Sequence, residues 1–165
     1  MAQRIVMGVD PSSKTGVVII QGDEVLYRGV LTSEREDYVQ KGIDIGLELL
    51  GMATLFEVTH INMEDFSLNS KFRLVDMVKL GTAIRMVLHR STPDVPFYNT
   101  PPKTLKLWAT HSGKATKKSM MAHCKRRFNF VGTNDEVDAF LLAKYLDLGI
   151  QEELTLNPLF WAPIY

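Results

Sequence analysis

Short apolar runs that stop at turn residues restrict the fold of this chain more than any other feature. Three such runs, over residues 4–9, 16–20 and 25–31, follow one another with only short polar links between them. Runs of this length are typical of β-strands, and links this short join antiparallel neighbours. The chain is therefore expected to begin with an antiparallel meander of three strands.

Longer amphipathic segments follow the meander and alternate with further strands. Apolar residues recur at spacings of three and four over 38–56, after possible capping residues at 32–36, and again over 74–88. Two more strands are expected over 59–64 and 95–98, and further helices over 104–109, over 114–128 and from Thr133 onward.

This order of elements predicts an α/β fold. The strand over 59–64 is joined to the meander through a helix, so it is expected to lie parallel to the first strand by a crossover. The result is a five-stranded mixed sheet, three antiparallel strands and then two parallel ones, with helices on both faces. A length of 165 residues fits one domain over 1–150, with the tail 151–165 packing on it without regular structure.

The apolar stripe over 74–88 has two interpretations. We expect it to face the core, and a subunit interface is the alternative. Gly81, at the middle of the stripe, would let this helix approach a neighbouring helix closely.

The composition points to a soluble protein of a reducing compartment. Cys124 is the single cysteine, which excludes an internal disulfide and a multi-thiolate zinc site. The longest apolar runs are far shorter than the roughly 18 residues of a membrane span, and residues 1–4 do not resemble a signal peptide. A cytoplasmic location is therefore expected.

The zero net charge of the chain hides a strong asymmetry. Between Val95 and Asn134 there is no acidic residue, so the eight cations of this stretch leave a charge of −8 for the remainder. A solvated basic face is one interpretation, but uncompensated cations interleaved with aromatic residues favour contact with nucleic-acid phosphates. The eight cations are Lys103, Lys106, Lys114, Lys117, Lys118, Lys125, Arg126 and Arg127.

Four carboxylates occupy positions that suggest one metal site. Asp10 and Glu64 each end an expected strand, and in α/β sheets ligands gather at the carboxyl ends of strands. Asp135 and Asp138 are three residues apart at a helix start, so both can point to one place. Carboxylate oxygens are hard ligands suited to Mg²⁺ or Mn²⁺.

The acids also have structural interpretations. Asp10 precedes a proline and can simply open a turn. Strand parity alone leaves open whether Glu64 or the adjacent Asp65 faces a site. Acids at a helix start can serve only the helix dipole, and we assign Glu136 to a capping box with Thr133.

At these residues the chain resembles the RuvC-type Holliday junction resolvases of the ribonuclease H-like superfamily. The likeness rests on residues 8–16, on the strand-end Glu64 and on the run 135–139, and it covers about residues 4–148. Lys106 and Lys117 fall in the positions of the two lysines that such enzymes need beside the active site.

The resemblance implies a homodimeric endodeoxyribonuclease that makes paired nicks across a four-way DNA junction and leaves 5′-phosphate ends. It implies two Mg²⁺ ions per site, for which Mn²⁺ would substitute. The implied ligands are Asp10, Glu64, Asp135 and Asp138, with Lys117 as a further catalytic residue. DNA contact is expected for Lys103, Lys106, Lys114, Lys117 and Lys118, and for Phe72 or Phe66 as a base-stacking aromatic.

Two departures from the family pattern concern loops that would face the substrate. The loop after Asp10 has Ser12 where the family usually has glycine, and it is one residue shorter before Thr15. The segment 65–80 is slightly longer than in bacterial members. The compact chain suggests a bacteriophage origin, for which the location would be the host cytoplasm.

Three other functions compete with this hypothesis. A nuclease of the same fold could act more broadly on forks, flaps, other branched DNA or RNA–DNA hybrids, because catalytic acids report chemistry and not substrate shape. An actin-like or sugar-kinase-like nucleotide-binding domain would use Ser12, Ser13 and Thr15 after Asp10 as a phosphate-binding hairpin, but no second copy of that loop is visible. A non-catalytic junction-binding protein is disfavoured because all four acids are present.

Overall fold

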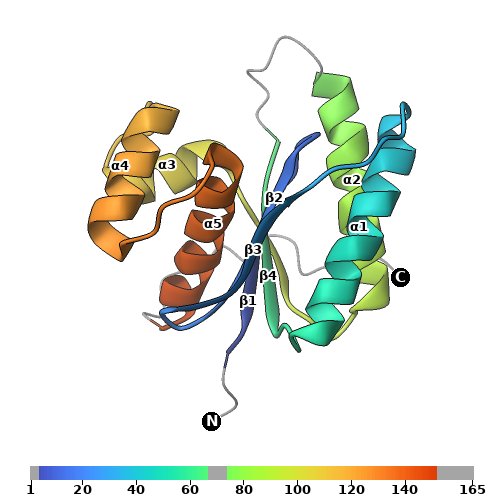
Figure 1. The fold of residues 1–165 in the computed structure, drawn as a ribbon, viewed down its shortest axis with the longest axis horizontal. Helices are drawn as coiled ribbons and strands as arrows, with labels where there is room; N and C mark the ends of the chain where they lie inside the picture. Colours follow the sequence, from blue (N-terminus) through green and yellow to red (C-terminus); the bar gives the residue numbers. More distant parts are fainter. Residues whose placement is uncertain (1–3, 67–73, 152–165) are drawn as a thin grey trace.

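The computed structural model describes residues 4–66 and 74–151, which form a central sheet between two layers of helices (Figure 1). The sheet has five strands in the order β3-β2-β1-β4-β5. The first three strands along the chain are antiparallel, and β4 and β5 run parallel to β1. The expected mixed sheet is confirmed. The strands are β1 (Val6–Asp10), β2 (Thr15–Gln21), β3 (Glu24–Leu31), β4 (His60–Glu64) and β5 (Phe97–Thr100).

Helices cover both faces of the sheet, as expected. Two of them, α1 (Tyr38–Leu55) and α2 (Leu74–Ser91), lie on one face. The other face is covered by α5 (Asn134–Gln151), outside which lie α3 (Pro102–Thr110) and α4 (Lys117–Phe128) (Figure 1).

Two hydrophobic clusters, one on each face of the sheet, explain why the first strands read as continuous apolar runs. Val18 and Ile20 pack with α5, whereas Val17 and Ile19 pack with α1 and α2. All four side chains are fully buried. A central strand that is covered on both faces needs apolar residues at every position rather than at alternate ones.

The start of α1 differs from the expected one. Asp37 caps this helix, and its Oδ1 accepts hydrogen bonds from the backbone N–H groups of Val39 and Gln40. Ser33, one of the expected caps, instead donates to Asp44 Oδ2 at 2.8 Å. A capping residue is identified by which side chain reaches the free N–H groups, and several residues of the segment 32–37 had suitable side chains.

The stripe on α2 belongs to the core. Leu80, Ile84 and Leu88 are fully buried among residues of α1 and the sheet. The core interpretation of residues 74–88 is therefore confirmed for these positions.

The expected role of Gly81 is wrong. A Cβ atom at this position would lie 2.7 Å from the ring of Phe66, so Gly81 makes room for that ring and not for a helix. The close approach of α1 to α2 occurs instead at Gly42, where a Cβ atom would lie 2.5 Å from Leu80 O and 2.7 Å from Ala83 Cβ.

Glycines of β1 and β2 let α5 lie directly on the sheet. A Cβ atom on Gly8 would overlap the carbonyl oxygen of Ala139 and lie 2.7 Å from the backbone nitrogen of Ala143. A Cβ atom on Gly16 would overlap Asp135 O and lie 2.5 Å from Asp135 C. The first turn of α5 therefore rests on the backbone at the start of β2, beside Asp10, and the following turns rest on β1 at Gly8.

The second half of α5 is tied to the sheet by two buried charges. Lys144 Nζ donates to Gly22 O at 2.6 Å and to Asp23 Oδ1 at 2.7 Å, in the turn between β2 and β3. Asp147 Oδ1 accepts from Arg4 Nε at 2.9 Å, just before β1. The hydrogen bond and charge of Lys144 lower the pKa of Asp23.

No helix among residues 4–66 and 74–151 is long and apolar enough to cross a membrane. The expected tail falls outside the described residues apart from Gln151, which ends α5.

Gly8→Ala is expected to destabilise the protein by several kcal/mol, because overpacking against helix backbone has no side chain that can move away. Urea unfolding would measure the loss. Gly51→Ala is the matched control: this glycine lies on the exposed side of α1 with nothing within 4 Å of an added Cβ atom. Replacing a helical glycine by alanine at such a position should stabilise by about 0.5–1 kcal/mol. Equal stability of both variants would contradict the close contact of α5 with β1.

Candidate active site

Two of the four acids end neighbouring parallel strands. In the register of β1 and β4, Gly8 is opposite Asn62 and Val9 is opposite Met63, so the next pair along the strands is Asp10 and Glu64. The two carboxylates are therefore adjacent at the carboxyl ends of β1 and β4.

Strand alternation places Glu64, and not Asp65, on the α5 side of the sheet. Asn62, two residues earlier, points to α5 and donates from Nδ2 to Leu142 O at 2.8 Å. Since side chains two apart in a strand share a face, Glu64 points the same way. Asp65 follows the end of β4 and also lines the cavity next to Glu64, and its Oδ1 accepts from the backbone N–H of Phe66 at 2.8 Å.

A capping box fixes the start of α5, where the other two acids lie. Thr133 N donates to Glu136 Oε2 at 2.8 Å, and Glu136 N donates to Thr133 Oγ1 at 3.3 Å, which confirms the structural role expected for Glu136. Arg28 of β3 reinforces this start, because its Nη1 donates to Val131 O at 2.6 Å and its Nε lies 3.6 Å from Glu136 Oε1.

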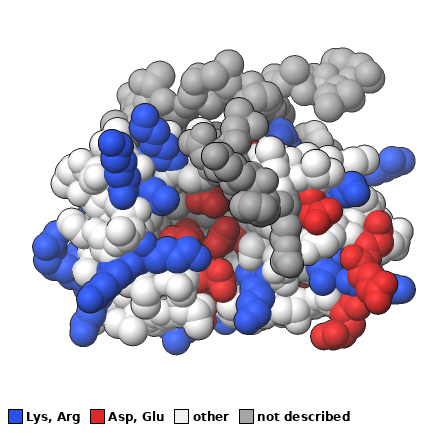
Figure 2. Space-filling model, turned by 90° about the horizontal axis from the view of Figure 1, so that it is seen from above, with Lys and Arg blue, Asp and Glu red and all other residues white. Residues whose placement is uncertain are grey.

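All four acids line one open cavity of about 370 Å³, and Asp65, Lys106 and Lys117 line it with them. Viewed from this end of the molecule, acidic residues gather in a hollow near the centre, and Lys and Arg side chains surround its α3–α4 side (Figure 2). The structure therefore brings together the four acids and two of the five expected DNA-contacting lysines. The acids are Asp10, Glu64, Asp135 and Asp138.

Crowding of like charges alters the acidity of Asp10. Its burial raises its pKa well above the usual value, and the charges of Glu64, Asp138 and Asp135 raise it further. The charge of Lys117 opposes these effects. Asp10 therefore sits in an environment that disfavours a bare negative charge.

Glu64 and Asp138 show the same effect. Burial raises the pKa of Glu64 to about 7, and the charge of Asp138 adds to the shift. Burial also raises the pKa of Asp138 to about 6. Lys106 and Lys117 lower both values, so the two lysines partly neutralise the carboxylates.

The donor set fits a hard divalent cation. Five carboxylates line the cavity, and the nearby thiol of Cys124 stays protonated because its burial and the charge of Asp138 raise its pKa to about 12. Within residues 4–66 and 74–151, no group of three or more His, Cys, Asp or Glu side chains already converges as a ready ligand set. The acids thus share a cavity, and binding an ion would require their side chains to close in on it.

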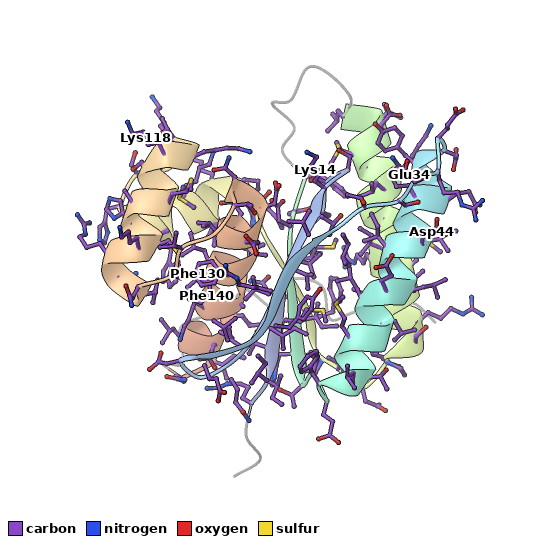
Figure 3. The ribbon with its side chains drawn as sticks, in the orientation of Figure 1. Lys14, Glu34, Asp44, Lys118, Phe130 and Phe140 are labelled. Atoms are coloured by element: carbon purple, nitrogen blue, oxygen red, sulfur yellow. The ribbon has the colours of Figure 1, made fainter. Side chains whose placement is uncertain are left out.

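The other three expected lysines lie outside the lining of this cavity. Lys103, Lys114 and Lys118 are exposed on α3, on the following loop and at the start of α4. Lys118 lies at the end of α4 nearest the carboxyl end of the sheet, and Lys14 lies at that same end in the turn after β1 (Figure 3).

Of the two candidate aromatic residues, Phe66 lines the cavity and packs on Gly81. Phe72 lies outside the described residues.

Sequence reasoning missed a polar pair beneath the site. Thr100 Oγ1 donates to Asn62 Oδ1 at 2.9 Å, and this buried Asn62 also donates to α5. The pair joins β5, β4 and α5 directly below Glu64. The signal in the sequence was a single asparagine inside an otherwise apolar strand.

Two of the three hydroxyl groups after Asp10 are engaged within their own turn. Ser12 Oγ donates to Lys14 O at 2.8 Å, and Thr15 Oγ1 donates to Ser12 O at 2.6 Å. This arrangement offers no support for the phosphate-binding hairpin of an actin-like or sugar-kinase-like domain.

The raised pKa of Glu64 predicts a pH-dependent stability. A carboxyl group with a raised folded-state pKa stabilises the fold fully below its unfolded pKa, and this contribution is lost as pH rises through the folded pKa. Between pH 4.5 and pH 7 the wild type should therefore lose up to about 3 kcal/mol through Glu64. Glu64→Gln has no such loss. Its free energy of unfolding, relative to that of the wild type, should therefore rise between pH 5 and pH 8, as measured by urea unfolding with EDTA.

Glu48→Gln removes the same charge from an exposed position of α1 and reports the effect of surface charge alone. A free-energy difference between Glu64→Gln and wild type that is the same at pH 5 and pH 8 would contradict the electrostatic description of the cavity.

Comparisons with known proteins identify the fold. No protein-family model and no curated protein sequence matches the chain. The solved structure of RuvC from Thermus thermophilus matches 90% of this chain and 96% of its own length, with a TM-score of 0.71 at 18% sequence identity. The structure of T. thermophilus RuvC in complex with Holliday junction substrate matches 88% of this chain and 96% of its own, with a TM-score of 0.70 at 18% identity.

A third similar structure comes from another group of organisms. The yeast mitochondrial Holliday junction resolvase Ydc2 matches 92% of this chain and 83% of its own length, with a TM-score of 0.58 at 14% identity. These identities are low, so the likeness concerns the fold. The chain has the ribonuclease H-like α/β fold of RuvC.

Proposed function

We propose that this protein is a metal-dependent endodeoxyribonuclease that resolves four-way DNA junctions. The observation that carries the proposal is the cavity at the carboxyl end of the sheet, where the four proposed ligands, a fifth carboxylate and two lysines lie together. Its support is the shared fold with T. thermophilus RuvC, a protein whose structure is known in complex with Holliday junction substrate.

In this proposal, Asp10, Glu64, Asp135 and Asp138 hold Mg²⁺, or Mn²⁺ in its place, with two ions per site. When bound, such ions would lower the pKa of a water molecule and stabilise the leaving 3′ oxygen in phosphodiester cleavage. The ends of β1 and β4 and the capped start of α5 provide the positions from which the four side chains bind.

The lysines of the cavity have a different task. Lys117 and Lys106 bind the non-bridging oxygens of the scissile phosphate and stabilise the negative charge that develops there during cleavage. Their charges also lower the pKa values of Glu64 and Asp138, which favours the ionised carboxylates that a cation requires. Cleavage of the bond between phosphorus and the 3′ oxygen leaves a 5′-phosphate end and a 3′-hydroxyl end.

Residues around the cavity bind the DNA beyond the scissile phosphate. Lys103, Lys114 and Lys118 bind phosphates next to the cleaved one, as exposed cations on its α3–α4 side. Phe72 or Phe66 stacks on a base that is unpaired at the branch point.

Asp138→Asn is expected to abolish nicking of a synthetic four-way junction in Mg²⁺, a loss of at least about a thousandfold, because one ligand and its charge are gone. Glu64→Gln should have the same effect. Junction binding, measured in a metal-free buffer by gel shift, should remain close to that of the wild type in both variants.

Glu48→Gln on α1 is the control, with an equal change of charge at an exposed position, and should cut normally. Wild-type nicking by Asp138→Asn would break the proposed mechanism. Efficient cutting of linear duplex without junction preference would favour instead the broader branched-DNA nuclease of the same fold.

A homodimer that makes paired nicks gives a separate prediction. On a supercoiled plasmid that extrudes a cruciform, two active sites acting within one binding event convert the circle directly to linear DNA. Accumulation of nicked circles at an early time, together with a monomeric mass in sedimentation, would contradict the dimer.

A further inference from the structure

The eight cations between Val95 and Asn134 separate into two groups in space. Five lie in or around the cavity. The other three occupy the last turn of α4, at the end of that helix away from the cavity, and all three are exposed. We name this second group, Lys125, Arg126 and Arg127, the α4 basic turn.

The helix dipole favours cations in this turn by only about 0.3–1 kcal/mol each. Of the ion pairs between described residues, none includes a member of the α4 basic turn. The turn therefore carries uncompensated positive charge in a chain whose net charge is zero.

Both arginines of the turn are held by neighbouring rings. The guanidinium carbon of Arg127 lies 4.7 Å from the ring centre of Trp108 and 5.0 Å from that of Phe128. Arg126 Nη2 lies 2.9 Å from His123 Nδ1, and because arginine only donates, the histidine nitrogen accepts. A guanidinium group that rests on a ring by its face keeps in-plane N–H donors for a phosphate, with less side-chain entropy to lose.

We propose that the α4 basic turn binds the phosphate backbone of a duplex arm that leaves the cavity. This inference rests on the proposed function. From Lys117 to Arg127 the helix rises about 15 Å, and phosphates of one DNA strand follow each other every 3.4 Å along the axis, so the contact falls about four to five base pairs from the scissile phosphate.

Lys118 and Lys125 connect the two groups. They are seven residues apart, which is close to two turns, so they lie on the same side of α4 and form a line of charge along it. Glu34 and Asp44 lie on the α1 side of the sheet, far from Lys118 (Figure 3), and Asp44 is paired there with Arg35 at 3.1 Å.

The Lys125→Gln/Arg126→Gln double variant tests the proposal. Its affinity for a four-way junction, measured by fluorescence anisotropy in metal-free buffer, should fall about tenfold, and the slope of log K against log salt should become shallower by about two. The rate of nicking at saturating enzyme should not change, because the turn is remote from the cavity.

Two further variants separate charge from folding. Lys125→Arg/Arg126→Lys keeps both charges and should keep wild-type affinity. Arg90→Gln removes one cation from the last turn of α2, in the other helical layer, and should leave affinity and salt slope unchanged.

Chemically modified DNA locates the contact. Uncharged methylphosphonate linkages four and five nucleotides from the scissile phosphate should weaken binding by the wild type more than binding by the Lys125→Gln/Arg126→Gln variant, which keeps only Arg127 of the three cations. If the wild type cuts junctions but the double variant keeps its affinity and salt slope, the arm contact is wrong and the proposed function stands. If the wild type neither binds nor cuts junctions, both fall.

Discussion

The contact of α5 with the backbone of β1 and β2 is the constraint on which the site depends. Gly8 and Gly16 remove the side chains that would separate helix and sheet. Because α5 lies so close, Asp135 and Asp138 line the same cavity as the strand-end residues Asp10 and Glu64. The same contact concentrates four acids in a partly closed space, and the raised pKa values follow from it.

Much of the fold could be predicted from the sequence because its signals were local. Continuous apolar runs predicted the central strands, and the 3.6-residue periodicity over 38–56 predicted α1. Helix boundaries were less accurate, since the helix expected from Lys114 begins at Lys117, where Thr116 caps it. The expected contact of Gly81 with a neighbouring helix was also wrong. A sequence reveals that a glycine makes space but not which residue fills it.

The site was predicted at the level of its acids and two lysines, and the reason is strand geometry. Acids that follow buried strands of a parallel pair must meet, whereas the choice between Glu64 and Asp65 depended on a register that only the structure supplies. The pair of Asn62 and Thr100 depended on contacts between β4, β5 and α5. Such long-range contacts leave no periodic signal in the chain.

The attachment of α5 at both of its ends has a mechanical consequence. The capping box and Arg28 fix its first turn, and Lys144 and Asp147 fix its second half to the turn after β2 and to the residue before β1. A helix attached at both ends in this way resists sliding along its axis. Any closing of the carboxylates around an ion must then come from side-chain rotation, with Asp135 and Asp138 turning about a fixed backbone.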